Sequence, residues 1–213
     1  MSRSTVKRAR PYDSSARRVA AERRRTQVLE AAAAHFASDG YAATTVAAVA
    51  ADAGVSAEMV YKAFGGKPGL VRALWVRALA GDGPVPAEER SDSLTGAKED
   101  PRTVIAGWAR LSMEVAPLAS PVALLVREAA ASDPAAARLR EELDQQRLER
   151  MRHNACALTD HLRPGLGVEA AGDVPFAFTA PELCELLVMR QGWSLAAYAD
   201  FLGRGIIAEL LAD

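Results

Sequence analysis

The sequence predicts an all-α protein of about nine helices, with a helix-turn-helix head at its N-terminal end and a larger helical body. Half of its 213 residues are hydrophobic, only 6 % are aromatic, and alanine dominates. Such a composition favours packed helices over sheets. Apolar residues recur at spacings of three and four through most of the chain, and Ser, Thr, Pro and Gly stand where helices begin and end.

The charge is divided unevenly along the chain. Residues 1–80 contain 13 Lys and Arg against 6 Asp and Glu, a balance of +7, whereas residues 81–213 contain 13 against 21, a balance of −8. This asymmetry suggests that one end of the protein contacts a polyanion. Chance clustering of charge on an unstructured tail is the alternative.

Residues 1–13 are predicted to form a disordered basic arm, and a helix is predicted to follow it. The helix begins at Ser14, carries several arginines along its first turns, and ends at Gly40, which is suited to a left-handed C-terminal cap. As a hypothesis, the arm enters a minor groove of DNA or lies along phosphates. A solvated tail is the alternative.

Two short helices are predicted to meet between Thr44 and Lys67. Thr45 and Ser56 stand where each of them needs an N-cap oxygen, and Gly54 allows a sharp turn between them. This pattern is typical of a helix-turn-helix, whose second helix lies in the major groove of DNA.

The residues of this stretch resemble the TetR family of bacterial transcriptional regulators. The matching residues are Gly40, Tyr41, Thr44, Thr45, Val46, Ala53, Gly54, Val55, Ser56, Val60, Tyr61, Phe64 and Lys67. The resemblance implies that Thr45 caps the first helix and touches a phosphate, that Tyr61 contacts DNA from the recognition helix, and that Lys67 pairs with a phosphate. A helix-turn-helix used only for packing is the alternative.

Helical geometry independently predicts which side chains of the second helix face outward. With Val60 turned inward, Ala57, Glu58, Tyr61 and Lys62 lie on the outer side. Glu58 is suited to accept from a cytosine amine, Lys62 to donate to guanine, and Ala57 to meet a thymine methyl group. Together with Thr45, Ser56, Tyr61 and Lys67, these residues form the predicted DNA-binding set.

The sequence also departs from the usual pattern of the family at several positions. Ala47 stands where a polar or basic residue is common, Lys62 replaces a frequent aromatic residue, and Ala63 replaces a frequent histidine. These differences make the operator sequence unreadable from the chain.

We expect three segments after the arm: a DNA-binding domain at 14–80, a linker at 81–101 and a helical domain for ligand binding and dimerisation at 102–213. Pro117 and Pro121 are predicted to interrupt a helix. Further on, we expect a long helix from Pro134 to about Leu162, a loop near Gly172–Pro175, and a last helix capped by Ser194. An acidic run, Glu141, Glu142 and Asp144, is predicted to form a solvated helix face.

The family resemblance implies a homodimer formed by the last two helices. Their apolar stripes contain the predicted interface residues Leu183, Leu186, Leu187, Leu195, Tyr198, Leu202, Ile206 and Leu210. Burial of these residues inside one monomer is the alternative.

The resemblance also implies a pocket for a small-molecule effector in the body. Candidate lining residues are the large or adaptable side chains Trp108, Met113, Met151, Phe176 and Phe178. An ordinary core is the alternative for each of them. His153 and His161 are about 12 Å apart along a helix, too far to share one zinc ion, so neither a metal nor another cofactor is predicted.

The resemblance to the TetR family implies a ligand-responsive regulator, in this family most often a repressor, that a small-molecule effector releases from a palindromic double-stranded DNA operator. The sequence contains no phosphate loop or nucleophile elbow, so no enzyme is predicted. The absence of a signal peptide and of a membrane-spanning run predicts a cytoplasmic protein without a membrane partner. A small-molecule-binding dimer with a degenerate head, or an enzyme built in the body, are the alternatives.

Overall fold

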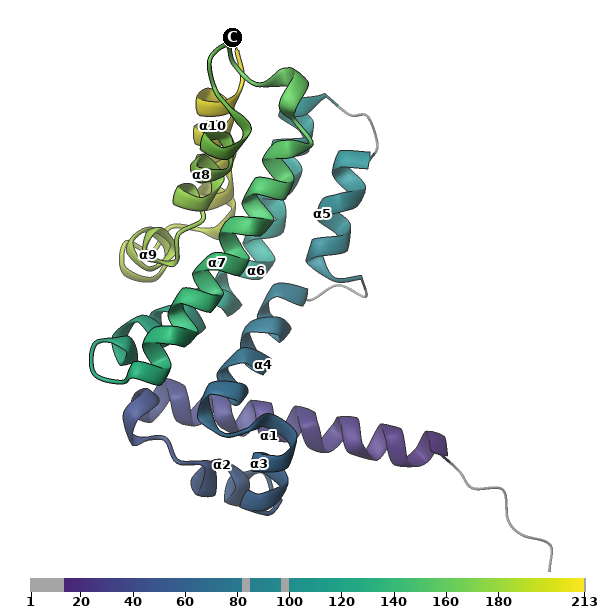
Figure 1. Ribbon diagram of the computed structural model, residues 1–213, viewed down its shortest axis with the longest axis vertical. Helices are drawn as coiled ribbons and strands as arrows, with labels where there is room; N and C mark the ends of the chain where they lie inside the picture. The colour runs from purple at the N-terminus through teal and green to yellow at the C-terminus, as the bar shows by residue number, and fades with distance from the viewer. Residues whose placement is uncertain (1–13, 82–84, 97–99, 213) are drawn as a thin grey trace, which may run out of the picture.

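The computed structural model describes residues 14–81, 85–96 and 100–212, and over these residues the chain forms helices and no strands (Figure 1). The predicted arm at residues 1–13 lies outside the described residues. The N-terminal helices are α1 (Ser14–Ala43), α2 (Val46–Asp52), α3 (Ala57–Phe64), α4 (Lys67–Ala80) and α5 (Ala87–Gly96). The remaining elements are α6 (Pro101–Ala130), α7 (Pro134–Cys156), a 3₁₀ turn (Thr159–His161), α8 (Val168–Phe178), α9 (Pro181–Cys184), a π-helical segment (Glu185–Arg190) and α10 (Leu195–Leu210).

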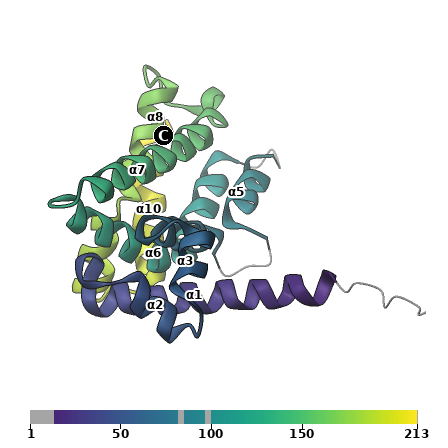
Figure 2. The same cartoon turned by 60° about the horizontal axis from the view of Figure 1, so that its bottom comes forward.

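The helices α1 to α3 form a head at one end of an elongated molecule, and α4 leads from this head into the body (Figures 1 and 2). Gly40 adopts a positive φ of 74° inside the last part of α1, so the predicted break in this helix is present. The close approach of α3 to α4 requires Gly69, because a Cβ atom there would lie 1.5 Å from the carbonyl oxygen of Phe64.

A first hydrophobic core crosses from the head into the lower body. It joins Val49 and Val60 of the head with Trp75 of α4, Val126 of α6 and Leu139 of α7. Because these side chains pack in one cluster, a movement of α4 requires repacking against α6 and α7.

A second core fills the upper body, where α10 packs on α6 and α8. Trp108 of α6, Leu158 after α7, and Tyr198, Leu202 and Ile206 of α10 belong to it. The last helix therefore directs its main apolar stripe into its own chain.

The predicted interruption at Pro117 and Pro121 is wrong, because α6 runs through both prolines. Each proline removes one helical hydrogen bond, from the carbonyl group four residues earlier. Both prolines lie on an exposed side of α6. Water can therefore reach this side of the helix, while its opposite side is held by packing against α7 and α10.

The long helix of the body is shorter than the sequence predicts, and a further helix, α8, lies where the sequence predicts a loop. Helix α7 ends at Cys156, where the Thr159 hydroxyl donates to the Cys156 carbonyl at 2.6 Å and helps to turn the chain. The expected loop at Gly172–Pro175 lies inside α8 instead. Gly172 lets α8 approach α7 closely, because a Cβ atom there would lie 2.5 Å from Cγ of Arg152.

One described helix, α6, is long and apolar enough to cross a membrane by length and composition alone. It contacts α4, α5, α7, α9 and α10 within the protein. Such contacts are those of the central core helix of the body.

Candidate nucleic-acid interface

The turn between α2 and α3 is held by two side-chain caps. The Thr45 hydroxyl accepts from the Ala48 amide at 3.1 Å, and the Ser56 hydroxyl accepts from the Met59 amide at 3.2 Å. Gly54 has a φ of 66° between the helices, in the left-handed region that glycine tolerates. Both hydroxyl groups are exposed and fix the start of a helix.

The second of these helices presents a polar face to solvent. Glu58, Tyr61 and Lys62 are exposed, with 57 % of Tyr61 accessible, while Val60 is fully buried on the opposite side. Ala57 is only half-buried because its position on the helix turns it partly toward the core. The face is short and projecting, and it combines a carboxylate, a phenol and an ammonium group. These groups can contact base edges and phosphates.

Lys67 lies differently from the other predicted DNA contacts. Its ammonium group donates to the carbonyl oxygens of Tyr41 at 2.7 Å and Ala42 at 3.2 Å, and it lies 4.6 Å from the centre of the Tyr41 ring. Two of its three N–H donors are therefore used to hold the end of α1. One donor is left for a phosphate.

Arg25 was not among the predicted site residues, yet it lies against the recognition helix. Its guanidinium group is 4.8 Å from the centre of the Phe64 ring, at the end of α3. Sequence patterns show the arginines of α1 but not which of them reaches α3. Met59 is a second exposed side chain of α3 that was not predicted.

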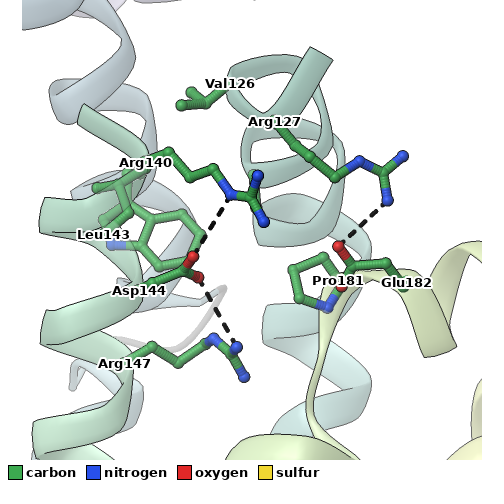
Figure 3. Close-up of a pocket in the computed structure, with 10 residues that line it drawn as sticks. Val126, Arg127, Arg140, Leu143, Asp144, Arg147, Pro181 and Glu182 are labelled. Atoms are coloured by element: carbon green, nitrogen blue, oxygen red, sulfur yellow. Dashed lines mark hydrogen bonds and ion pairs between the residues drawn. The ribbon is translucent and has the colours of Figure 1, made fainter. Parts of the chain in front are cut away.

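A small polar cavity of about 30 Å³ lies where α4, α6, α7 and α9 meet (Figure 3). Asp144 lies between Arg140 at 3.6 Å and Arg147 at 3.8 Å, and Arg127 pairs with Glu182 at 3.1 Å. The predicted solvated face is therefore wrong for Asp144, which is half-buried between two arginines, whereas Glu141 of the same run is exposed. A cavity of this size holds about one or two water molecules, so an organic ligand could enter only if the surrounding helices separated.

The five predicted pocket residues do not line this cavity, and they fall into two groups. Trp108, Met113 and Phe178 belong to the upper core, where Nε1 of Trp108 is buried and has no hydrogen-bond partner among the residues that the structure describes. Phe176 lies under the guanidinium group of Arg147, 3.7 Å away, and Met151 lies 4.0 Å from the hydroxyl of the neighbouring Thr179. Burial lowers the pKa of Arg147, but an arginine keeps its charge at any physiological pH.

Four of the eight residues predicted to form the dimer interface are buried within their own chain. Tyr198, Leu202, Ile206 and Leu210 have 2 % or less of their surface exposed and belong to the upper core of their own chain. The reason is geometric: this stripe of α10 is the one that packs on α6. Leu183, Leu187 and Leu195 are half-buried, and Leu186 is exposed.

An exposed apolar surface remains on the π-helical segment and the loop that follows it. Leu186, Met189 and Trp193 are 45 %, 56 % and 39 % exposed. The Trp193 ring contacts Phe201 of α10 edge to face at 5.9 Å. Large apolar side chains exposed together mark a surface that another molecule covers.

The described residues include no group of side chains suited to holding a metal ion. Over the described residues, no three His, Cys, Asp or Glu side chains are placed to hold one ion. His35 lies between two acidic side chains, with its ring nitrogens 3.1 Å from Asp39 and 2.8 Å from Asp52. This cluster joins α1 to α2.

Comparison with known protein families matches residues 28–74 to the sequence profile of the bacterial regulatory proteins of the tetR family. The matched segment contains α2, α3 and parts of α1 and α4. It therefore covers most of the head described above and the first half of α4. A search of curated proteins found no match.

Solved structures resemble the whole described fold. NalD of Pseudomonas aeruginosa, the secondary repressor of the MexAB-OprM multidrug efflux pump, is 19 % identical over 90 % of this chain and 98 % of its own, with a TM-score of 0.68. SmeT, solved with triclosan, is 19 % identical over 89 % and 92 %, with a TM-score of 0.69. The ketosteroid regulator KstR2 of Mycobacterium tuberculosis is 21 % identical over 89 % and 96 %, with a TM-score of 0.58. At these identities the likeness establishes a shared fold.

Proposed function

Through the head at residues 28–74 this chain belongs to the tetR family of bacterial regulatory proteins, and we propose that it is a ligand-responsive repressor that binds a palindromic DNA operator as a homodimer. The observation that carries this proposal is the capped helix α3, which exposes Glu58, Tyr61 and Lys62 on one face. A cytoplasmic regulator is thus favoured over an enzyme.

The geometry of α3 supports contacts between its side chains and base edges in the major groove. Because Ser56 caps α3 and Val60 anchors it in the core, the exposed face is held rigidly on the head. We propose that Glu58 and Lys62 contact base edges and that Thr45, Tyr61 and the third donor of Lys67 contact the DNA backbone.

We propose that the dimer forms through the outer surface of the π-helical segment and α10. Leu186, Met189 and Trp193 supply its apolar centre. Asp200 and Arg204 border the hollow beside Trp193. A two-fold axis could pair Asp200 of one subunit with Arg204 of the other, because an isologous interface brings the same patch of both chains together.

The effector is proposed to act by changing the distance between the two heads. Two recognition helices must lie about 34–36 Å apart, or a multiple of this, to occupy successive major grooves. A small molecule that enters the body between α4, α6 and α7 would repack the core shared with the head. NalD as an efflux-pump repressor and SmeT with its bound triclosan support a small-molecule effector. Typical coupling of this kind changes affinity by about five- to 150-fold.

Selection of bound duplexes from a random pool tests the function directly. The expected result is a palindrome whose half-sites are separated by about one helical turn or a multiple of it. Enrichment of no sequence, together with no retention of any duplex at low salt, would refute the proposed function.

A further inference from the structure

The N-terminal half of α1 projects away from the rest of the molecule (Figures 1 and 2). From Ser15 to Gln27 every side chain is exposed except that of Ala20, which is half-buried. Burial in the core begins only at Val28 and Leu29. At a rise of 1.5 Å per residue, this exposed half of the helix is about 20 Å long.

This projecting segment is strongly basic. Five arginines, residues 17, 18, 23, 24 and 25, are opposed by one acidic residue, Glu22. At 100° per residue, Arg17, Arg18, Arg24 and Arg25 fall within about one third of the helix circumference. The four side chains therefore form one face, which we call the arginine face.

The arginine face lies on the same side of α1 as the recognition helix. Arg25 marks this side, because its guanidinium group lies against the Phe64 ring at the end of α3. Arg18 precedes Arg25 by seven residues and so lies almost directly above it along the helix, about 10.5 Å further out.

The direction of the projection is also informative. Figure 1 shows the free end of α1 on the side of the molecule opposite to α8, α9 and α10. A partner subunit seated on the π-helical segment and α10, as proposed above, would leave this end pointing away from the dimer axis. In such a dimer the two projecting helices lie over the outer flanks of the bound duplex.

We propose that the arginine face is a second DNA-binding surface, which binds backbone phosphates of the duplex flanking each half-site. This inference rests on the proposed function. A length of about 20 Å corresponds to about six base pairs, since B-DNA rises about 3.4 Å per pair. Guanidinium groups bind phosphate oxygens through paired N–H donors and require no particular base sequence.

The composition of the segment favours DNA over a lipid surface. A helix that lies on a membrane needs a broad apolar face opposite its basic residues. Between Ser15 and Gln27 the only large aliphatic side chain is Val19, and the other apolar residues are alanines. The segment therefore has charge to offer a polyanion but little apolar surface to insert.

The test compares the salt dependence of binding to a 40-base-pair random-sequence duplex. A triple variant, Arg17→Gln, Arg18→Gln and Arg24→Gln, is measured beside the unchanged protein by fluorescence anisotropy between 50 and 300 mM salt. Since each phosphate contact contributes about 0.9 to the slope of log affinity against log salt, the variant is expected to lose about two to three units per subunit. The matching Lys substitutions should keep the slope, because they keep the charges.

A second triple variant controls for the change in net charge. Arg102, Arg110 and Arg163 are exposed arginines of the body, and their replacement by Gln should leave the slope unchanged. Circular dichroism of both triple variants must match the parent spectrum.

Three results would overturn the proposal. Equal slopes for the Gln variant of the arginine face and the parent would leave the head as the DNA contact and remove α1 from it. A loss of binding to anionic phosphatidylserine vesicles without a change on the duplex would assign the face to membranes. No binding of any form to DNA at 50 mM salt would refute the proposed function as well.

Discussion

The side chains of Arg72 and Glu142 form a bidentate ion pair between α4 and α7. Nε of Arg72 lies 2.8 Å from Oε1 of Glu142, and Nη2 lies 2.7 Å from Oε2. Helix α4 continues directly from the head, whereas α7 belongs to the body. The pair thus joins the two parts at their surface, above the core that they share, and the Arg72 guanidinium lowers the pKa of Glu142.

We expect this pair to couple the two helices while adding little to global stability. Both side chains are partly exposed, and exposed pairs contribute about 0.2–1 kcal/mol. A double-mutant cycle of Arg72→Gln and Glu142→Gln in urea unfolding should give a coupling energy in this range. Hydrogen exchange in residues 67–80 should also become faster in each single variant.

Glu141→Gln provides the control for that cycle, because Glu141 is an exposed neighbour on the same helix. It should change neither unfolding nor exchange in α4. A coupling energy of zero between Arg72 and Glu142 would show that the pair does not hold the helices together.

Replacement of Lys67 by Ala should affect both the stability of the head and the binding of DNA. Hydrogen bonds of a charged donor contribute about 1.5–3 kcal/mol, so the loss of the contacts to Tyr41 and Ala42 should lower the free energy of unfolding by about this amount. The salt slope should fall by about one unit if the third donor binds a phosphate. Unfolding and anisotropy measurements give the two quantities separately.

Lys62→Ala is the natural comparison, because Lys62 is exposed on α3. Its removal should leave unfolding unchanged and alter the preference for particular base pairs by about 1–3 kcal/mol. Affinities for single-base variants of the selected duplex measure this effect. Equal losses on every duplex would assign Lys62 to the phosphate backbone instead.

His35 gives the head a dependence on pH. Hydrogen bonds to Asp39 and then Asp52 raise the pKa of His35 above its ordinary value of 6.5. A raised folded pKa means that the stabilising contribution is complete below pH 6.5 and is lost as the pH rises through the folded value. The Tm difference between the parent and His35→Asn should therefore shrink between pH 6 and pH 8.5.

The titration of Asp39 does not contribute to the change in this Tm difference between pH 6 and pH 8.5. Its pKa is lowered below 3.8 by His35 and Ser38, so its own titration lies well under the pH range used. A Tm difference that stays constant from pH 6 to pH 8.5 would contradict the assignment of the effect to His35.

The head could be predicted from the sequence because its signals are local. Thr45 and Ser56 were expected to cap helices, and each accepts the amide three residues later. Gly54 was expected at a turn and has a positive φ. Caps and turns depend on chemistry within a few residues, which the sequence displays directly.

The body could not be predicted to the same depth because tertiary packing decides it. Apolar periodicity shows that Leu202 and Ile206 lie on one stripe, but not whether that stripe faces α6 or another subunit. Likewise, Pro117 and Pro121 are strong local signals for a break, and the packing of α6 on its neighbours overrides them. The ion pair of Arg72 with Glu142 joins residues 70 positions apart, beyond any local pattern.

The exposed apolar surface of the π-helical segment is expected to be required for dimerisation. Leu186→Asp combined with Met189→Asp places two charges on the exposed apolar surface of the π-helical segment. Because burial of an unpaired carboxylate costs several kcal/mol, the variant should be a folded monomer at micromolar concentration. Light scattering measures its mass, and DNA affinity should fall as the second head is lost.

Val76→Asp, a substitution of an exposed apolar residue on α4, should leave the dimer intact. A double aspartate variant that remains dimeric would show that this surface is not the dimer interface. The stripe of Tyr198, Leu202 and Ile206 offers no alternative surface, because it packs within its own chain.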